Sequence, residues 1–152
     1  MKHEKYVDLL VTNDYHQYEF TSIGPKGEIP KIIQFTVTED ESIVNLAFGN
    51  KKEDGSIDDL TRDNNNDRNK ILATVVSVVI VFCKVYPEKW VLFTGSTPER
   101  TRLYRMAITL NYEELAIDFE IVGLLKDMDA YIDVPFGKGI DYLGFLVRHK
   151  KA

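Results

Sequence analysis

Cysteine, histidine and long apolar runs are all scarce in this sequence of 152 residues. A single cysteine, Cys83, cannot form an internal disulfide, and the N-terminus begins M-K-H-E-K, without the apolar stretch of a secretory signal peptide. The longest apolar block, residues 71–83, is shorter than the roughly 20 residues that span a bilayer. We therefore expect a cytoplasmic protein without a membrane anchor, in which Cys83 is a buried, small hydrophobic side chain.

Several motifs of enzyme active sites are also missing. The sequence has no P-loop, no G-x-G-x-x-G and no G-x-S-x-G. The three histidines, His3, His16 and His149, are dispersed, which favours neither nucleophilic catalysis nor, with only one cysteine, a zinc site. We therefore expect no cofactor and no bound metal, and the absences favour a protein that is not an enzyme.

The charge balance is acidic, with a formal net charge of -5 and a pI of about 5.2. Broad, non-specific binding to duplex nucleic acid needs an extended basic surface, so the acidic net charge argues against such binding. An acidic protein can still carry a local basic patch. A length of 152 residues and a hydrophobic fraction of 44% are typical of one globular domain. We expect residues 1–152 to form a single domain.

The hydrophobic pattern predicts an α+β fold. Residues 68–86 carry apolar side chains nearly all round a helix, so this should be the central, buried helix. Two segments, 15–23 and 29–38, alternate apolar and polar side chains as strands do, and a turn at 24–27 should join them into a hairpin. The other expected elements are a strand at 43–48, a strand at 90–93 buried on both faces, a helix from residue 98, an irregular stretch at 126–139, and strands at 119–123 and 142–147. The predicted order is β-β-β-α-β-α-β-β, with an antiparallel sheet packed on one long buried helix and a second, shorter helix.

The segment W-V-L-F-T-G-S-T-P-E-R-T-R-L-Y combines local geometry with chemistry. Gly95 permits a sharp turn, Thr97 is a good N-cap, and Pro98 suits the first helical position. The N-terminus of a helix favours an anion, and Arg100 and Arg102 would add forked donors for phosphate or carboxylate. Because basic side chains at this end oppose the helix dipole, they are mildly unfavourable unless an anion binds beside them.

We therefore predict an anion site at residues 95–105 of a non-catalytic binding module for a phosphate-bearing ligand, such as a nucleotide or single-stranded nucleic acid. The residues expected to contact the ligand are Gly95, Ser96, Thr97, Arg100, Arg102 and Tyr104. Tyr104, Tyr15 or Tyr18 could provide a stacking surface for a base. In the alternative interpretation the arginines, Arg105 included, pair with surface carboxylates or lie in water, and the tyrosines pack in the core.

A long polar stretch, residues 51–67, precedes the central helix, and its length points to mobility or function. Asp63, Asn65 and Asp67 match the first, third and fifth positions of a calcium-binding loop. The match then fails, because the positions of its glycine and its bidentate glutamate hold other residues. The simpler interpretation is a solvated loop in which Asn66 or Asp67 caps the following helix.

Two other functions stay open at this point. A metal-dependent phosphodiesterase could combine Arg100 and Arg102 as a phosphate clamp with carboxylates of the polar stretch, if that stretch folds toward the turn. Those carboxylates are Asp58, Asp59, Asp63 and Asp67. A protein-interaction module, with the acidic stretch facing a basic protein partner, would need no small ligand at all.

Several segments together resemble an uncharacterised family of small bacterial proteins of unknown function, found mostly in Bacteroidetes. They are N-L-A-F-G-N at 45–50, the pair Asp58-Asp59, N-N-x-D-x-x-K-I-L-A-T-V at 64–75, and G-S-T-x-x-R-T-R-L-Y at 95–104. The resemblance extends over residues 18–150 and implies a single-domain member of that family. It implies no activity, substrate or catalytic residue.

Overall fold

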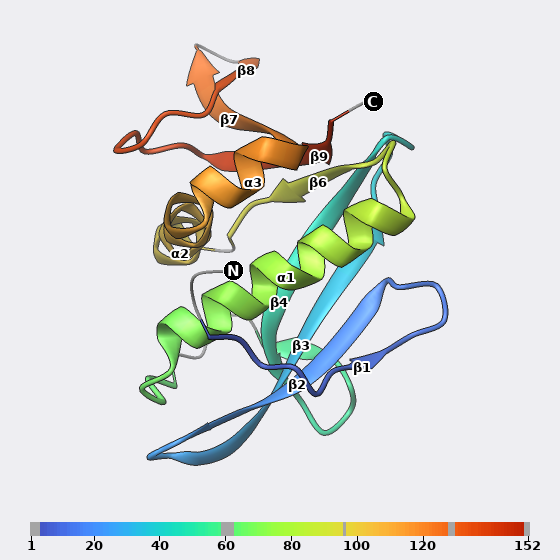
Figure 1. Cartoon of the computed structure of the whole chain (residues 1–152), viewed down its shortest axis with the longest axis vertical. Helices are drawn as coiled ribbons and strands as arrows, with labels where there is room; N and C mark the ends of the chain where they lie inside the picture. Colours follow the sequence, from blue (N-terminus) through green and yellow to red (C-terminus); the bar gives the residue numbers. More distant parts are fainter. Residues whose placement is uncertain (1–3, 59–62, 96, 128–129, 151–152) are drawn as a thin grey trace.

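The computed structural model describes residues 4–58, 63–95, 97–127 and 130–150, and Figure 1 shows their arrangement. The strands are β1 (Leu10–Val11), β2 (Gln17–Gly24), β3 (Gly27–Val37), β4 (Ile43–Lys51), β5 (Ile57–Asp58), β6 (Trp90–Phe93), β7 (Phe119–Asp127), β8 (Ala130–Pro135) and β9 (Gly144–His149). The helices are α1 (Arg68–Val85), α2 (Pro98–Leu110) and α3 (Tyr112–Asp118). The α+β class predicted from the sequence is confirmed.

The strands of the described chain join in one sheet with the order β1-β2-β3-β4-β6-β9-β7-β8, and β5 pairs with β4. The predicted hairpin of β2 and β3 is present, and β4 continues it as an antiparallel meander. The sheet is not wholly antiparallel, however, because β4 and β6 run parallel. Their connection contains α1, and a helical crossover is what returns a chain to a parallel neighbour.

Four elements of the structure are absent from the predicted order: the short strands β1 and β5, the strand β8 and the helix α3. The stretch at 126–139 is not irregular, because it contains β8, which pairs with β7 from Val122↔Pro135 to Asp127↔Ala130. Residues 112–118 form a helix of 7 residues, α3, so the chain described has a third helix besides the 18-residue α1 and the 13-residue α2. Within the sheet, the last strand, β9, lies between β6 and β7.

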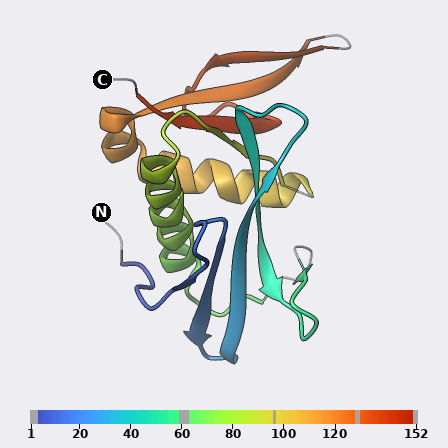
Figure 2. The same ribbon diagram turned by 90° about the vertical axis from the view of Figure 1, so that its right-hand side faces the viewer.

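Both long helices cover the same face of the sheet (Figure 2). Phe82 of α1 stacks on Phe35 of β3, with ring centroids 4.1 Å apart, and Tyr104 of α2 meets Phe93 of β6 edge-on at 5.6 Å. Phe35 and Phe93 are both cross-strand partners of Leu46, so they belong to one face. This face and the two helices enclose the hydrophobic core.

The other face of the sheet is uncovered at β6, which corrects the prediction of a strand buried on both faces. Val91 and Phe93 are buried, whereas Trp90 and Leu92 are half-buried on the opposite side. The Arg148 guanidinium lies over the Trp90 ring, 4.2 Å from its centroid. An apolar run such as residues 90–93 therefore does not tell whether a central strand is covered on both faces of the sheet or on one face only.

Helix α1 is the buried helix that the sequence predicts, and Cys83 on it is fully buried. Burial raises the pKa of the Cys83 thiol to about 12, which keeps it protonated and unreactive at neutral pH. Within the described part of the chain, no helix is both long and apolar enough to cross a membrane.

Two valines of α1 test this packing with the same chemical change. Val79 is 2% exposed and Val81 is 41% exposed. We expect Val79→Ala to lower the free energy of unfolding by about 2 kcal/mol, because it removes buried methyl groups and leaves a cavity. Val81→Ala should change it by less than about 0.5 kcal/mol, since alanine also favours the helix. Urea titrations monitored by circular dichroism measure both values, and equal losses would contradict the assigned face of α1.

Candidate functional site

The N-terminus of α2 has the local geometry that the sequence predicts. Thr97 is the N-cap, in an extended conformation, and its hydroxyl oxygen accepts the Arg100 N–H at 3.2 Å, while Pro98 is the first helical residue. Gly95 is required for a close approach, because a Cβ there would lie 2.3 Å from the Thr101 nitrogen. Ser96, also predicted to contact the ligand, lies outside the described residues.

Two amides of this turn, those of Gly95 and Arg100, are engaged within the turn itself. Gly95 N–H donates to the Thr101 hydroxyl at 3.0 Å, Arg100 N–H donates to Thr97, and Pro98 has no N–H. An anion at this end of the helix would therefore meet side chains before it meets these backbone donors.

The arginines of α2 point in different directions. Residues two apart on a helix are separated by about 200° around its axis, so Arg100 and Arg102 lie on opposite sides. The Arg100 guanidinium lies over the Phe48 ring of β4, 5.6 Å from its centroid, and Arg102 is exposed. Arg105 donates to the Ile140 carbonyl and to the Asp141 carboxylate. The three side chains do not converge in one clamp, and Arg105 is an ion-pair residue, as the alternative interpretation held.

Tyr104 is a core residue and not a ligand-binding surface. It is 3% exposed, because its position on α2 faces the sheet together with Ala107 and Ile108. Tyr18 is also buried, at 2% exposed, whereas Tyr15 is 40% exposed. The prediction that Tyr104 or Tyr18 could stack on a base is therefore wrong.

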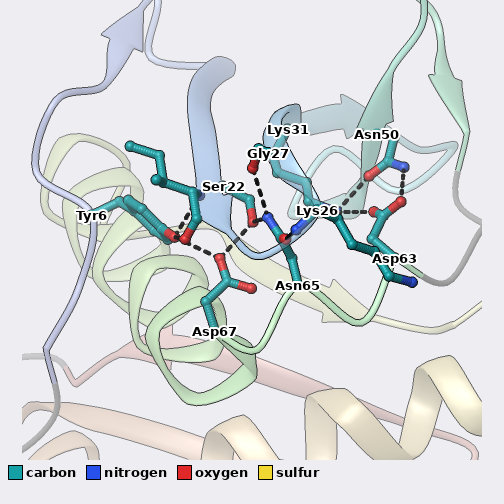
Figure 3. A network of polar contacts seen from close by, with 10 residues as sticks. Tyr6, Ser22, Lys26, Gly27, Lys31, Asn50, Asp63, Asn65 and Asp67 are labelled. Carbon is teal, nitrogen blue, oxygen red and sulfur yellow. Dashed lines mark hydrogen bonds and ion pairs between the residues drawn. The ribbon is translucent and has the colours of Figure 1, made fainter.

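The end of the polar stretch, residues 63–67, lies against the sheet, as Figure 3 shows. Asp63, Asn65 and Asp67 are each bonded to different parts of the sheet and the N-terminal segment, so their oxygens do not converge as in a calcium loop. In the described residues, no group of three or more histidine, cysteine or acidic side chains is placed to hold a metal ion. Asp59, one of the carboxylates of the phosphodiesterase hypothesis, lies outside those residues.

Asp63 closes a ring of three side chains with Lys31 and Asn50 (Figure 3). The Lys31 ammonium donates to the Asn50 amide oxygen and to the Asp63 carboxylate, each at 2.5 Å, and the Asn50 amide donates to the second carboxylate oxygen at 3.1 Å. The side chains of Lys31 and Asp63 are only 8% and 15% exposed. Lys31 was not among the predicted site residues. The alternation along β3 nevertheless indicates its burial, because Lys31 lies on the same face of the strand as the buried Ile33 and Phe35.

Asp67 and Asn65 form a second part of the same network. The Asp67 carboxylate accepts the hydroxyls of Tyr6 and Ser22, each at 2.5 Å. The Asn65 amide donates to Ser22 at 3.1 Å and to the Gly27 carbonyl at 3.0 Å, and its oxygen accepts the Lys26 N–H at 2.7 Å. Asp67 is the N-cap of α1 by position, but its carboxylate does not cap the helix because the two hydroxyls engage it.

The polar stretch and the start of α2 meet at Phe48. Its ring has the Lys31 ammonium 6.0 Å and the Arg100 guanidinium 5.6 Å from its centroid, and Lys31 is held by Asp63. Beside it, Gly49 lets the backbone of Asp58 approach, since a Cβ there would lie 2.3 Å from the Asp58 carbonyl oxygen. Three of the segments that carry the family resemblance, at 45–50, 58–59 and 95–104, therefore contribute residues to one region of the molecule.

A profile described as "Family of unknown function (DUF6934)" matches residues 2–150. The chain belongs to this family. The uncharacterised family to which the sequence pointed is thereby confirmed, and membership brings no activity with it. No curated protein and no solved structure matches the chain significantly. Any function must therefore be argued from the residues around Phe48.

The buried pair of Lys31 and Asp63 gives a test of this region. Lys31→Met or Asp63→Leu alone should lower the free energy of unfolding by about 3 kcal/mol or more, because each leaves one buried charge without its partner. The double variant should recover most of that loss. The control is Lys51→Met, which breaks a more exposed pair with Glu19 and should lower stability by less than about 1 kcal/mol. Additive losses in a double-mutant cycle by urea unfolding would contradict the coupling.

Proposed function

We propose that this chain is a non-catalytic binding module that takes a phosphate-bearing ligand, such as a nucleotide or single-stranded nucleic acid, beside the first two turns of α2. The observation that carries the proposal is the pair of cationic side chains from separate segments, Lys31 of β3 and Arg100 of α2, against one Phe48 ring at the start of a capped helix. Arg102, exposed on the opposite side of the same helix, adds a further positive charge at the surface.

The charges around this turn determine which groups would bind the ligand. Asp63 balances the Lys31 charge, and Glu99 in the first turn of α2 offsets part of the positive end of the helix. The exposed guanidinium of Arg102 is then the main attraction for an anion, and its forked donors match the geometry of phosphate oxygens. Because Arg102 is exposed, the binding should weaken as the salt concentration rises.

The burial of Tyr104 and Tyr18 restricts how a nucleotide would be recognised. With these two rings in the core, phosphate contacts and not base stacking should supply the affinity. Purine and pyrimidine nucleotides should therefore bind alike, and a triphosphate should bind more tightly than a monophosphate.

The phosphodiesterase alternative gains no support from Asp63 or Asp67. Asp63 binds Lys31 and Asn50, and Asp67 binds Tyr6 and Ser22, so neither is directed at a common centre. A protein partner for the acidic stretch, residues 51–67, stays a proposal, and the titration described next also tests it.

The test is an amide-resolved NMR titration of the full chain with inorganic phosphate, nucleoside mono- and triphosphates and a short single-stranded oligonucleotide, with and without magnesium. We expect saturable shifts confined to the amides around residues 95–104. Arg102→Ala should weaken triphosphate binding about tenfold, the loss expected for one charge-assisted hydrogen bond.

The matched control is Lys84→Ala, which removes the same charge from an exposed position near the end of α1. The affinity of this variant for the triphosphate should stay within about twofold of that of the unchanged chain, since only screened, long-range attraction is lost. Equal weakening by both variants, or the absence of shifts at residues 95–104 with every ligand, would contradict the proposed site. In the second case, copurification of a stoichiometric protein would favour the interaction module.

A further inference from the structure

The N-terminal segment, residues 4–11, is attached to the rest of the protein mainly through Tyr6. Tyr6 is 9% exposed, whereas Val7 and Leu10 of the same segment are 72% and 71% exposed. The only ladder pairs of the segment are Leu10↔Glu19 and Val11↔Tyr18, between β1 and β2. Tyr6 is thus the one buried side chain of this segment, and Leu9 is half-buried against the core.

Tyr6 occupies a slot between α1 and β2 that fits each part of its side chain. Its ring stacks on Phe20 with centroids 5.3 Å apart, and the Lys70 ammonium lies 4.3 Å from the centre of the Tyr6 ring. At the closed end, the Tyr6 hydroxyl donates to Asp67 at 2.5 Å (Figure 3) and accepts the Ile23 N–H at 2.9 Å.

The backbone of the segment is held in the slot as well. The Tyr6 N–H donates to the buried Thr74 hydroxyl of α1 at 2.9 Å. The slot therefore provides an aromatic wall, a cation over the ring, a carboxylate and an amide for the hydroxyl, and an acceptor for the backbone. Its ligand is a tyrosine in an extended peptide.

The turn that connects this segment to β2 contains a strained residue. Tyr15 has a φ of 61°, in the left-handed region that is unfavourable for a bulky side chain. The turn is closed by Thr12 N–H donating to the Gln17 carbonyl and by Tyr15 N–H donating to the Thr12 carbonyl, each at 3.0 Å. A short connection under strain is a feature that favours exchange of a terminal segment between two copies of a chain.

We propose that the Tyr6 slot is an interaction site and that its partner is a second copy of this chain, which inserts its own residues 4–11 reciprocally. The one ligand whose fit the structure displays is this segment, and another copy carries the same segment. Exchange conserves every contact of Tyr6 and opens the turn at Tyr15. A twofold-symmetric dimer results, in which each slot is filled by the partner.

The experiment uses the full chain, refolded at high concentration and then measured by light scattering from micromolar to millimolar concentrations. We expect a slowly exchanging dimer. A mixture of differently isotope-labelled chains should show an NOE between the Tyr6 ring of one copy and the Phe20 ring of the other. A strictly monomeric chain, or a dimer without that NOE, overturns the proposal.

A pair of variants at residue 15 separates exchange from other modes of dimerisation. Tyr15→Gly relieves the strain of the closed turn, so the dissociation constant of the dimer should rise about tenfold. Tyr15→Phe keeps a bulky side chain at the same φ and should leave the constant unchanged. Equal dissociation constants for the two variants would overturn the proposal.

Discussion

The Asp67 carboxylate is the group on which the arrangement at the start of α1 depends. Helix α1 is apolar on nearly all sides, so the chain that leads into it must enter beside buried strands, where unpaired polar groups are strongly unfavourable. Asp67 accepts hydroxyls from the N-terminal segment and from β2 at the point where α1 begins. Its negative charge also suits the N-terminal end of the helix. One side chain thereby joins three segments that are distant in the sequence.

The same requirement positions the candidate site. The chain before Asp67 is polar, and its side chains are satisfied by the sheet: Asn65 by the turn of β2 and β3, and Asp63 by Lys31. Lys31 is thereby fixed against Phe48, which also receives Arg100 from α2. A buried network therefore adjoins the proposed phosphate site and fixes Lys31 against Phe48 before a ligand arrives.

The sequence predicted correctly those features that depend on residues close together in the chain. The Thr97 cap and the Pro98 start of α2 are decided within four residues, and the apolar stripe of α1 within its own length. The partners of Asp67 are 45 and 61 residues away, and Lys31 and Asp63 are 32 residues apart, so no local pattern could pair them. Tyr104 was misassigned because its helical position faces the core, a fact that depends on which side of α2 the sheet covers. The parallel contact of β4 and β6 and the strand at 130–135 likewise depend on pairing across the whole sheet.

The central claim is that Asp67 holds the N-terminal segment, β2 and the start of α1 as one unit. The most direct measurement is amide hydrogen exchange in Asp67→Ala, with the exposed Asp8→Ala as the control of equal charge change. The account predicts that the amides of Tyr6, Ile23 and Lys26, none bonded to the Asp67 carboxylate, lose protection together by about tenfold or more relative to β9. Unchanged protection at Lys26 while Tyr6 alone exchanges faster would show that the three segments are held independently, which would contradict the account.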